Sequence, residues 1–536
     1  MNVIELSAAH RAAVDRRRRI ICQEDGISPF GALGMDMREW LEYRLNLIDT
    51  AGCQIDAIIW DVGLCADSYA VYQKTRLLPQ VDFPGLNEWR KQGIDFLETL
   101  VTETHKRGRE AFWNERISEV DMPQPFCSCP HESPLRENYL KKAHPDWVVK
   151  CWWPQGLWNL ANPELRRHKI RRLKELVENY DLDGLQLDFA RHTPCLPPEA
   201  EWKNREHVTE FVRMTRTMLQ EMEKIKDKPL LLAVRVAETI DGCHRDGFEV
   251  EKWAKENLVD VFTLGGRTGE VDIEAFKRIT HGKNIKLCPS FDGHHTNDGY
   301  YHPPFAYYRG VFSNWLEQGA DSVGVFNWTC AGEEVYDSLS DGFDMKCRSQ
   351  RDALFEAGCL ADMRDKAKLY AVERRGGYPW AGNYLYRNDD KPLPFKVSNG
   401  STLAELPVFI YTPCAADKFQ TTLDIITWRI SIAEIAEVRM NGRVLPFLSS
   451  DDSWTDPQIY CDKPQPTCGG WKCFPIAPEY KLLKATYELP ADCLKIGRNI
   501  VSVRCESTET GELRTIEKIE VHTHKNEQIS SVSVSR

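Results

Sequence analysis

The stretch DGLQLDFARH at 183–192 places a carboxylate inside an apolar run. Asp188 interrupts the run from Leu185 to Phe189, and Arg191 and His192 follow at once. An ionised carboxylate is costly to bury unless it is paired, and a nearby cation lowers its pKa. We therefore expect Asp188 to stay ionised at the end of a buried strand, which suits a nucleophile or a general base.

A second carboxylate, Glu238, ends the apolar run LLLAVRVAE at 230–238. A carboxyl group that apolar neighbours desolvate has a raised pKa and can act as a general acid. Glycoside cleavage needs two such groups, one protonating the leaving oxygen and one attacking or activating water. We predict Asp188 and Glu238 as this catalytic pair, with the retaining or inverting outcome left open.

Polar side chains also end most of the other apolar runs. Each one alone has a structural explanation, such as a helix N-cap. Taken together they predict a polar, carboxylate-rich pocket. The predicted substrate-binding residues are Asp61, Asn114, Glu115, Arg191, His192, Arg235, Arg267, Asp292, His294, Asn327 and Trp328, together with Trp153 from a long loop.

The elements that must position these groups follow from the hydrophobic pattern. From about residue 18 to 335, short apolar runs alternate with amphipathic helical patterns, which is typical of repeated βα units. The predicted strands lie at 19–26, 56–63, 109–118, 183–191, 230–238, 259–266, 285–293 and 321–329.

This pattern predicts an α/β fold, a (β/α)8 TIM barrel whose active site forms at the carboxyl ends of the strands. An open doubly wound sheet is the alternative, and it is disfavoured because no glycine-rich phosphate loop follows the first strand. The period of two along a strand sends Gln186 and Asp188 to the inner face, and Leu185, Leu187 and Phe189 to the outer face.

The segment 117–158 is too long for a simple connection. Long loops in this position are usually functional. Its Trp152, Trp153 and Trp158 are candidate platforms for sugar rings. The alternative is a lid that packs on itself, which the sequence leaves equally open.

After about residue 380, short alternating runs separated by turn residues predict a C-terminal antiparallel β-sandwich. Asn441-Gly442 is a strong signal for a two-residue hairpin turn. We predict a catalytic barrel domain at 18–365 and a β-sandwich domain at 375–525.

Composition excludes several classes of function. The 536 residues carry a net charge of −11, which argues against nucleic acid as the main partner. No run approaches the roughly 20 apolar residues of a membrane helix. The eighteen cysteines are scattered singly, which favours a reducing compartment. Without a recognisable signal peptide we expect a cytoplasmic protein, or a secreted or periplasmic one if a leader was removed. The expected partner is a carbohydrate substrate, with no cofactor and no metal.

Residues 158–192 resemble the glycosyl-hydrolase-like TIM-barrel proteins of the family 10-like type. The matching positions are Asn159, Pro163, Glu164, Arg166, Tyr180, Asp181, Asp183, Gly184, Asp188 and Arg191. The stretch is similar, more loosely, to the fourth-strand region of α-amylase-type barrels, in which an aspartate at the strand end is the nucleophile. Those barrels usually have arginine where this chain has Gln186. The resemblance implies a carbohydrate-active barrel with an auxiliary β-sandwich.

Two other functions stay open. One is a barrel protein that binds carbohydrate without cleaving it. The other is a metal-dependent hydrolase or lyase using Asp61, Glu115, Asp292, His294 and His295, although the first strand has no His-x-His pair. For the leading hypothesis we expect Asp188→Asn to abolish activity and to leave the melting temperature unchanged or higher.

Overall fold

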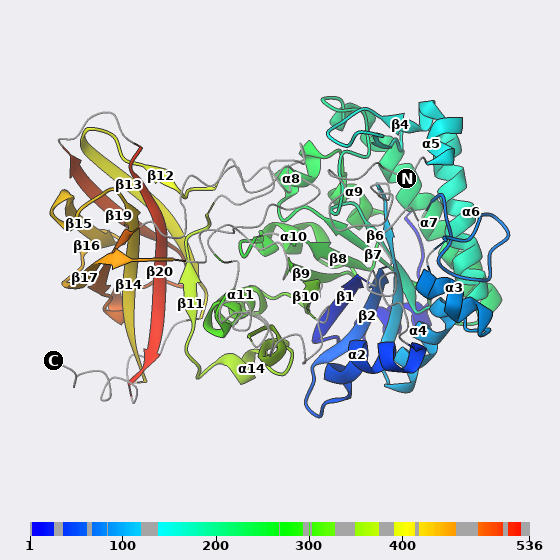
Figure 1. Cartoon of the computed structure of the whole chain (residues 1–536), viewed down its shortest axis with the longest axis horizontal. Helices are drawn as coiled ribbons and strands as arrows, with labels where there is room; N and C mark the ends of the chain where they lie inside the picture. Colours follow the sequence, from blue (N-terminus) through cyan, green and yellow to red (C-terminus); the bar gives the residue numbers. More distant parts are fainter. Residues whose placement is uncertain are drawn as a thin grey trace.

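The structure is a computed structural model in which two units are visible (Figure 1). A barrel wrapped by helices lies on the right of the figure, and a pair of β-sheets lies on the left. The described residues are 3–25, 36–61, 67–82, 84–118, 138–266, 268–292, 300, 303–326, 328, 349–374, 391–412, 418–456, 481–507 and 513–526.

Eight parallel strands close into a barrel in the order β1-β10-β9-β8-β7-β6-β3-β2. Their bounds are β1 (Ile20–Asp25), β2 (Ile55–Asp61), β3 (Glu110–Arg116), β6 (Gly184–Asp188), β7 (Leu231–Val236), β8 (Val261–Leu264), β9 (Lys286–Asp292) and β10 (Val323–Phe326). All eight predicted strands are present, so the (β/α)8 barrel is confirmed. The open doubly wound alternative is wrong, because β1 pairs with both β2 and β10.

Helices surround this barrel. They are α1 (Ala8–Asp15), α2 (Met37–Asp49), α3 (Pro84–Lys91), α4 (Phe96–Lys106), α5 (Tyr139–Ala143), α6 (Pro163–Asn179), α7 (Arg205–Lys226), α8 (Ile240–Arg245), α9 (Val250–Lys255), α10 (Ile273–Thr280), α11 (Phe305–Glu317) and α14 (Leu360–Met363). A short pair of strands, β4 (Val148–Val149) and β5 (Leu157–Trp158), lies before α6.

The start of α6 follows from its sequence. Asn162 is the N-cap, and its side-chain oxygen accepts hydrogen bonds from the backbone N–H groups of Glu164 (2.8 Å) and Leu165 (3.2 Å). Pro163 occupies the first helical position, where a missing N–H costs nothing. The long helix thus begins at a fixed point directly before the strand that carries Asp188.

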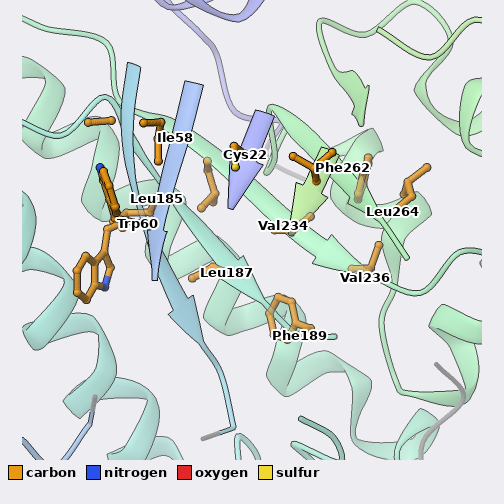
Figure 2. Close-up of a cluster of buried hydrophobic side chains, with 14 of the residues drawn as sticks. Cys22, Ile58, Trp60, Leu185, Leu187, Phe189, Val234, Val236, Phe262 and Leu264 are labelled. Atoms are coloured by element: carbon orange, nitrogen blue, oxygen red, sulfur yellow. The ribbon is translucent and has the colours of Figure 1, made fainter. Parts of the chain in front are cut away.

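The outer surface of the barrel is apolar and packs under the helices. Figure 2 shows Leu185, Leu187 and Phe189 of the β6 region with Val234 and Val236 of β7, all among the buried residues of one large core. The predicted outward face of 185–189 is therefore confirmed.

The interior of the barrel changes character along its axis. Its amino-terminal half is filled by apolar side chains such as Ile21, Phe112 and Leu231, with Val14 of α1 packed against them. Gly184 is needed here, because a Cβ at this position would overlap the ring of Phe112 and the carbonyl oxygen of Leu231. The polar network described below lies in the carboxyl-terminal half, beyond these apolar side chains.

The helix α1 is held against this floor by buried charges. The Nε of Arg18 donates to Glu110 (2.5 Å) at the start of β3. The Nε2 of His10 lies 2.9 Å from Oδ1 of Asp260, and its Nδ1 contacts Glu223. Burial alone lowers the pKa of His10, but the hydrogen bonds to the two carboxylates outweigh it and raise that pKa to about 9.

Two antiparallel sheets form the second unit, in agreement with the predicted β-sandwich. One has the order β11-β20-β14-β18-β17 with β12 beside β20, and the other has the order β13-β19-β15-β16. The strands are β11 (Leu369–Ala371), β12 (Phe395–Lys396), β13 (Gly400–Ile410), β14 (Phe419–Trp428), β15 (Ile435–Met440), β16 (Arg443–Val444), β17 (Phe447–Trp454), β18 (Leu482–Glu488), β19 (Gly497–Ser507) and β20 (Thr515–Lys525).

The hairpin predicted at Asn441-Gly442 joins β15 to β16. Met440 pairs with Arg443, and the two residues between them have φ values of 51° and 87°. Positive φ at both central positions is the requirement of a type I′ turn. This prediction is confirmed.

The two units meet through α11 and β11, which lie between them in Figure 1. Leu369 belongs to the core of the barrel, whereas Tyr370, the next residue, belongs to the core of the sandwich. The side chain of Asn314 in α11 donates to the carbonyl of Phe409 (2.7 Å) and accepts from the N–H of Tyr411 (2.9 Å). The predicted domain limits, 18–365 and 375–525, lie on either side of β11 and stay predictions.

Within the residues that the structure describes, no helix is both long enough and apolar enough to span a lipid bilayer.

Candidate active site

Asp188 is fully buried at the end of β6, on the inner face of the barrel. Its Oδ1 accepts hydrogen bonds from the backbone N–H groups of Ala190 (3.0 Å) and Arg191 (2.9 Å). Its Oδ2 accepts from Nη1 of Arg235 on β7, at 3.1 Å. The predicted inward direction of Asp188 is therefore confirmed, and its charge is paired.

A second carboxylate, Asp61 at the end of β2, faces the same interior. Its Oδ2 accepts from the side-chain amide groups of Gln23 (2.9 Å) and Asn114 (2.8 Å), and from Nε of Arg116 (2.9 Å). The same two amide groups lie 3.4 Å from Oδ2 of Asp188. The two aspartates thus share their donors and form one network.

Gln186 lies one layer deeper, two residues before Asp188. Its Nε2 donates to the side-chain oxygens of Gln23 (3.0 Å) and Asn114 (2.9 Å), and its Oε1 accepts from the hydroxyl of Thr263 (2.8 Å) on β8. These bonds fix both amides with their N–H groups directed at the aspartates. Gln186 therefore fixes the side chains that donate hydrogen bonds to the two aspartates above it.

Two arginines gather around Phe326 at the end of β10. The guanidinium carbons of Arg235 and Arg191 lie 5.1 Å and 5.8 Å from the centre of its ring. The Nε of Arg235 also donates to the carbonyl of Gly265 (3.1 Å). A Cβ on Gly266 would overlap Nη2 of Arg235, so glycine is required there for the arginine to reach Asp188.

The charges around Asp188 decide its protonation state. Burial raises the pKa of the Asp188 carboxyl, but the guanidinium groups of Arg235 and Arg116 and the amide of Gln23 act in the opposite direction and prevail. The net pKa lies below the usual range of an aspartate. Asp188 is therefore a hydrogen-bond acceptor at neutral pH and has no proton to donate.

Glu238 follows β7 and is buried. It lies beside Gly265, where a Cβ would come 3.2 Å from the Cβ of Glu238. Its carbonyl accepts from the N–H of Asp272 (3.0 Å). Its role as the general acid stays a prediction.

Glu115 departs from its predicted place. It alternates with Asn114 and Arg116 on β3 and therefore points outward, where it is fully buried. Its carboxylate contacts Arg172 and lies 3.4 Å from Nζ of Lys169, both on α6. Glu115 is thus part of a buried ionic cluster between strand and helix, and we remove it from the candidate site.

Two predicted tryptophans are core residues. Trp153 is buried in a small cluster with Val149 and Leu157. Trp328 is buried with its ring 4.6 Å from that of Tyr308 in α11. Neither presents a face that could receive a sugar ring, and the part of the loop around Trp153 packs on itself.

The same loop still reaches the strand ends through Trp152. This half-buried residue donates from Nε1 to the carbonyl of Thr193 (2.8 Å), and its ring centre lies 6.2 Å from that of the buried His192. His192 follows Arg191 in the chain, and Trp152 packs beside His192. Both residues therefore lie next to the network.

The structure gives little information on four other predicted residues. Asp292 ends β9, with its backbone beside Phe326. Arg267, His294 and Asn327 lie outside the described residues, and their assignment to the site stays a prediction.

Several members of the network were absent from the predicted set: Gln23, Arg116, Gln186, Thr263 and Phe326. Arg116 ends β3, Gln23 lies two residues before the end of β1, and Gln186 shares the inner face with Asp188, so a strict count of alternate residues would have found them. Thr263 and Phe326 lie in strands that read as uniformly apolar, and the sequence carries no comparable signal for them.

No protein-family model matches the sequence. A segment of 161 residues is 24% identical to glycosyl hydrolase YngK of Bacillus subtilis (strain 168), and the match spans 29% of this chain and 29% of that relative. This similarity agrees with the resemblance to glycosyl-hydrolase-like barrel proteins.

Solved structures with a similar course of the chain have low identity. The glycoside hydrolase domain of PgaB (BpsB) from Bordetella bronchiseptica is 12% identical, with a TM-score of 0.41, over 64% of this chain and 99% of that one. An α-amylase from Malbranchea cinnamomea is 13% identical, with a TM-score of 0.36, over 91% and 97% of the two chains.

Proposed function

We propose that the protein is a glycoside hydrolase that acts on an oligo- or polysaccharide at the carboxyl-terminal end of its barrel. The observation that carries the proposal is the buried network at the strand ends, in which Asp188 accepts from Nη1 of Arg235 (3.1 Å) and shares its amide donors with Asp61. The glycosyl hydrolase among its relatives supports the same class of reaction.

In this proposal Asp188 supplies negative charge to an oxocarbenium-like transition state, as nucleophile or as base. The two backbone N–H groups at Ala190 and Arg191 hold Oδ1 in a fixed direction, so little reorganisation is needed when charge develops. Glu238 is the proposed proton donor. Arg191, His192 and Trp152 are the proposed contacts of the substrate.

A second candidate is a barrel that binds carbohydrate without cleaving it. The complete burial of Asp188 and the engagement of both its oxygens favour this candidate, because a nucleophile must reach the anomeric carbon. The metal-dependent alternative loses one of its five proposed ligands, since Glu115 points away from Asp61 and towards α6.

The test is a panel of oligosaccharides with detection of products by mass spectrometry. We expect hydrolysis by the wild-type chain and a loss of about 10²–10⁴-fold in kcat/KM for Asp188→Asn and for Glu238→Gln. Asp181→Asn is the matched control, because Asp181 is exposed, pairs with Lys228 and lies before β6 at the opposite end of the barrel.

Two results would overturn the proposal. Wild-type turnover by Asp188→Asn on a cleaved substrate would remove this residue from the chemistry. Binding of an oligosaccharide by the wild-type chain with no product after prolonged incubation would favour the non-catalytic candidate.

A further inference from the structure

A cavity of about 560 Å³ lies between the two units, and none of its described lining residues belongs to the hydrogen-bonded network of Asp188. Its barrel side is formed by Thr239, which follows β7, by residues 269–272 after β8, and by α11. Its sandwich side is formed by β11 and by the end of β13. Its size falls within the range of small-ligand sites, which occur preferentially at domain interfaces.

Aromatic rings line the cavity from both sides. Tyr307 belongs to α11, whereas Phe409 and Tyr411 lie at the end of β13. Phe409 and Tyr411 are half-buried, so part of each ring is accessible. Aromatic faces attract cations and also bind the apolar faces of sugar rings.

The described residues that line the cavity carry an excess of negative charge. Glu270, Asp272, Glu274 and Glu373 are the carboxylates, and Lys391 is the one cation among them. Asp272 caps α10, and Glu274 forms an ion pair with Arg278. Glu270 and Glu373 are neighbours, because Oε1 of Glu373 accepts from the backbone N–H of Glu270 (3.1 Å). A wall with this charge favours a cationic ligand.

Glu373 is held rigidly at the base of this wall. It is buried, and its Oε1 accepts from the backbone N–H groups of Gly269 (2.7 Å) and Glu270 (3.1 Å). Burial raises the pKa of Glu373 in spite of these bonds and of Lys391. A cation bound beside it would recover part of the free energy that burial costs the carboxylate.

We propose that this cavity binds a saccharide that carries free amino groups. The ammonium group would lie between Glu270 and Glu373, and the sugar rings would stack on Phe409 and Tyr411. The choice of a saccharide over another amine rests on the proposed function, whereas the choice of a cation rests on the carboxylates and the rings alone.

The test is isothermal titration calorimetry of the full chain with a fully deacetylated glucosamine tetramer and with its N-acetylated counterpart. We expect the deacetylated tetramer to bind and the acetylated one to bind at least tenfold more weakly, because acetylation removes the charge. Glu270→Gln and Tyr411→Ala are each expected to weaken binding about tenfold or more. Glu405→Gln is the matched control, since Glu405 is an exposed residue of β13 outside the cavity.

Three results would overturn the proposal: no binding of the deacetylated tetramer, equal binding of both tetramers, or binding that Glu270→Gln and Tyr411→Ala leave unchanged. Binding that is lost in Asp188→Asn would also overturn it, because the ligand would then occupy the barrel. The titration measures no turnover, so its result is independent of whether the barrel hydrolyses any sugar. A melting curve for each variant shows that the loss is not one of folding.

Discussion

Replacing Asp188 by asparagine tests the electrostatics of the network directly. The residue is fully buried, and Oδ2 lies 3.1 Å from Nη1 of Arg235, which is equally buried. The structure reverses the expectation from the sequence, in which the melting temperature is unchanged or higher. We now expect Asp188→Asn to destabilise the fold, because it leaves the Arg235 guanidinium buried without its counter-charge.

The magnitude follows from the geometry. At an effective dielectric constant of about 20, two unit charges 3.1 Å apart attract by about 5 kcal/mol. Breaking a buried pair by removing one partner costs about 3–5 kcal/mol. An asparagine oxygen can still accept from the N–H groups of Ala190 and Arg191, so we expect the lower end, about 3 kcal/mol.

The double variant Asp188→Asn/Arg235→Met separates this effect from a loss of packing. With both charges removed, the destabilisation should be smaller than the sum of the two single changes by about 2 kcal/mol or more. Urea unfolding at pH 7, followed by tryptophan fluorescence, measures all four proteins, and Asp181→Asn serves as the surface control. A single variant as stable as the wild-type chain, or effects that add, would refute the reasoning.

Two further predictions concern the two ends of the barrel. The raised pKa of His10, about 9 against 6.5, stabilises the fold by about 3 kcal/mol. This stability is fully present below pH 6.5 and lost as the pH rises through 9. The difference in unfolding free energy between wild-type and His10→Gln should therefore shrink over that range, and a constant difference would contradict the assignment. Gly266→Ala should displace Arg235 and lower stability by about 2–3 kcal/mol. Gly282→Ala, also at positive φ but with open space around it, should cost less; equal shifts in melting temperature would show that backbone strain alone is responsible.

The barrel strands could be predicted from the sequence because each is a short apolar run that lies between two amphipathic helical patterns. In 183–191 the apolar residues face outward and pack under the helices, whereas the polar residues face inward at the candidate active site. The alternation of residues along the strand therefore predicted both the buried face and the polar face. Whether a given polar residue at a strand end points into the barrel or outward was harder to predict. Glu115 and Asn114 are neighbours with opposite directions, and only the pairing of β3 with β6 decides which one points inward.

Other parts of the site depend on contacts that are distant in the sequence. Trp153 was expected to bind substrate because it lies in a long loop, and Trp328 because it follows a predicted strand. Both are buried, Trp153 with Val149 and Leu157 and Trp328 against Tyr308, and the sequence does not show these contacts. In β20, Lys518 and Glu520 interrupt the apolar pattern although both are buried. Their burial depends on an ion pair between them (3.2 Å) and on Asp456, which lies 2.9 Å from Nζ of Lys518, and the sequence pattern does not show these contacts.

The contact of Asn314 has a consequence for any attempt to separate the two units. Among the strands that the structure describes, β13 is the outermost of its sheet, so no described strand pairs with its other side. The carboxamide of Asn314 occupies part of that side at Phe409 and Tyr411 in the manner of a neighbouring strand. A sandwich expressed alone would lose this contact, and an exposed strand edge is a site at which other chains can pair. The contact of Asn314 with β13 thus covers part of a strand edge that would otherwise be exposed.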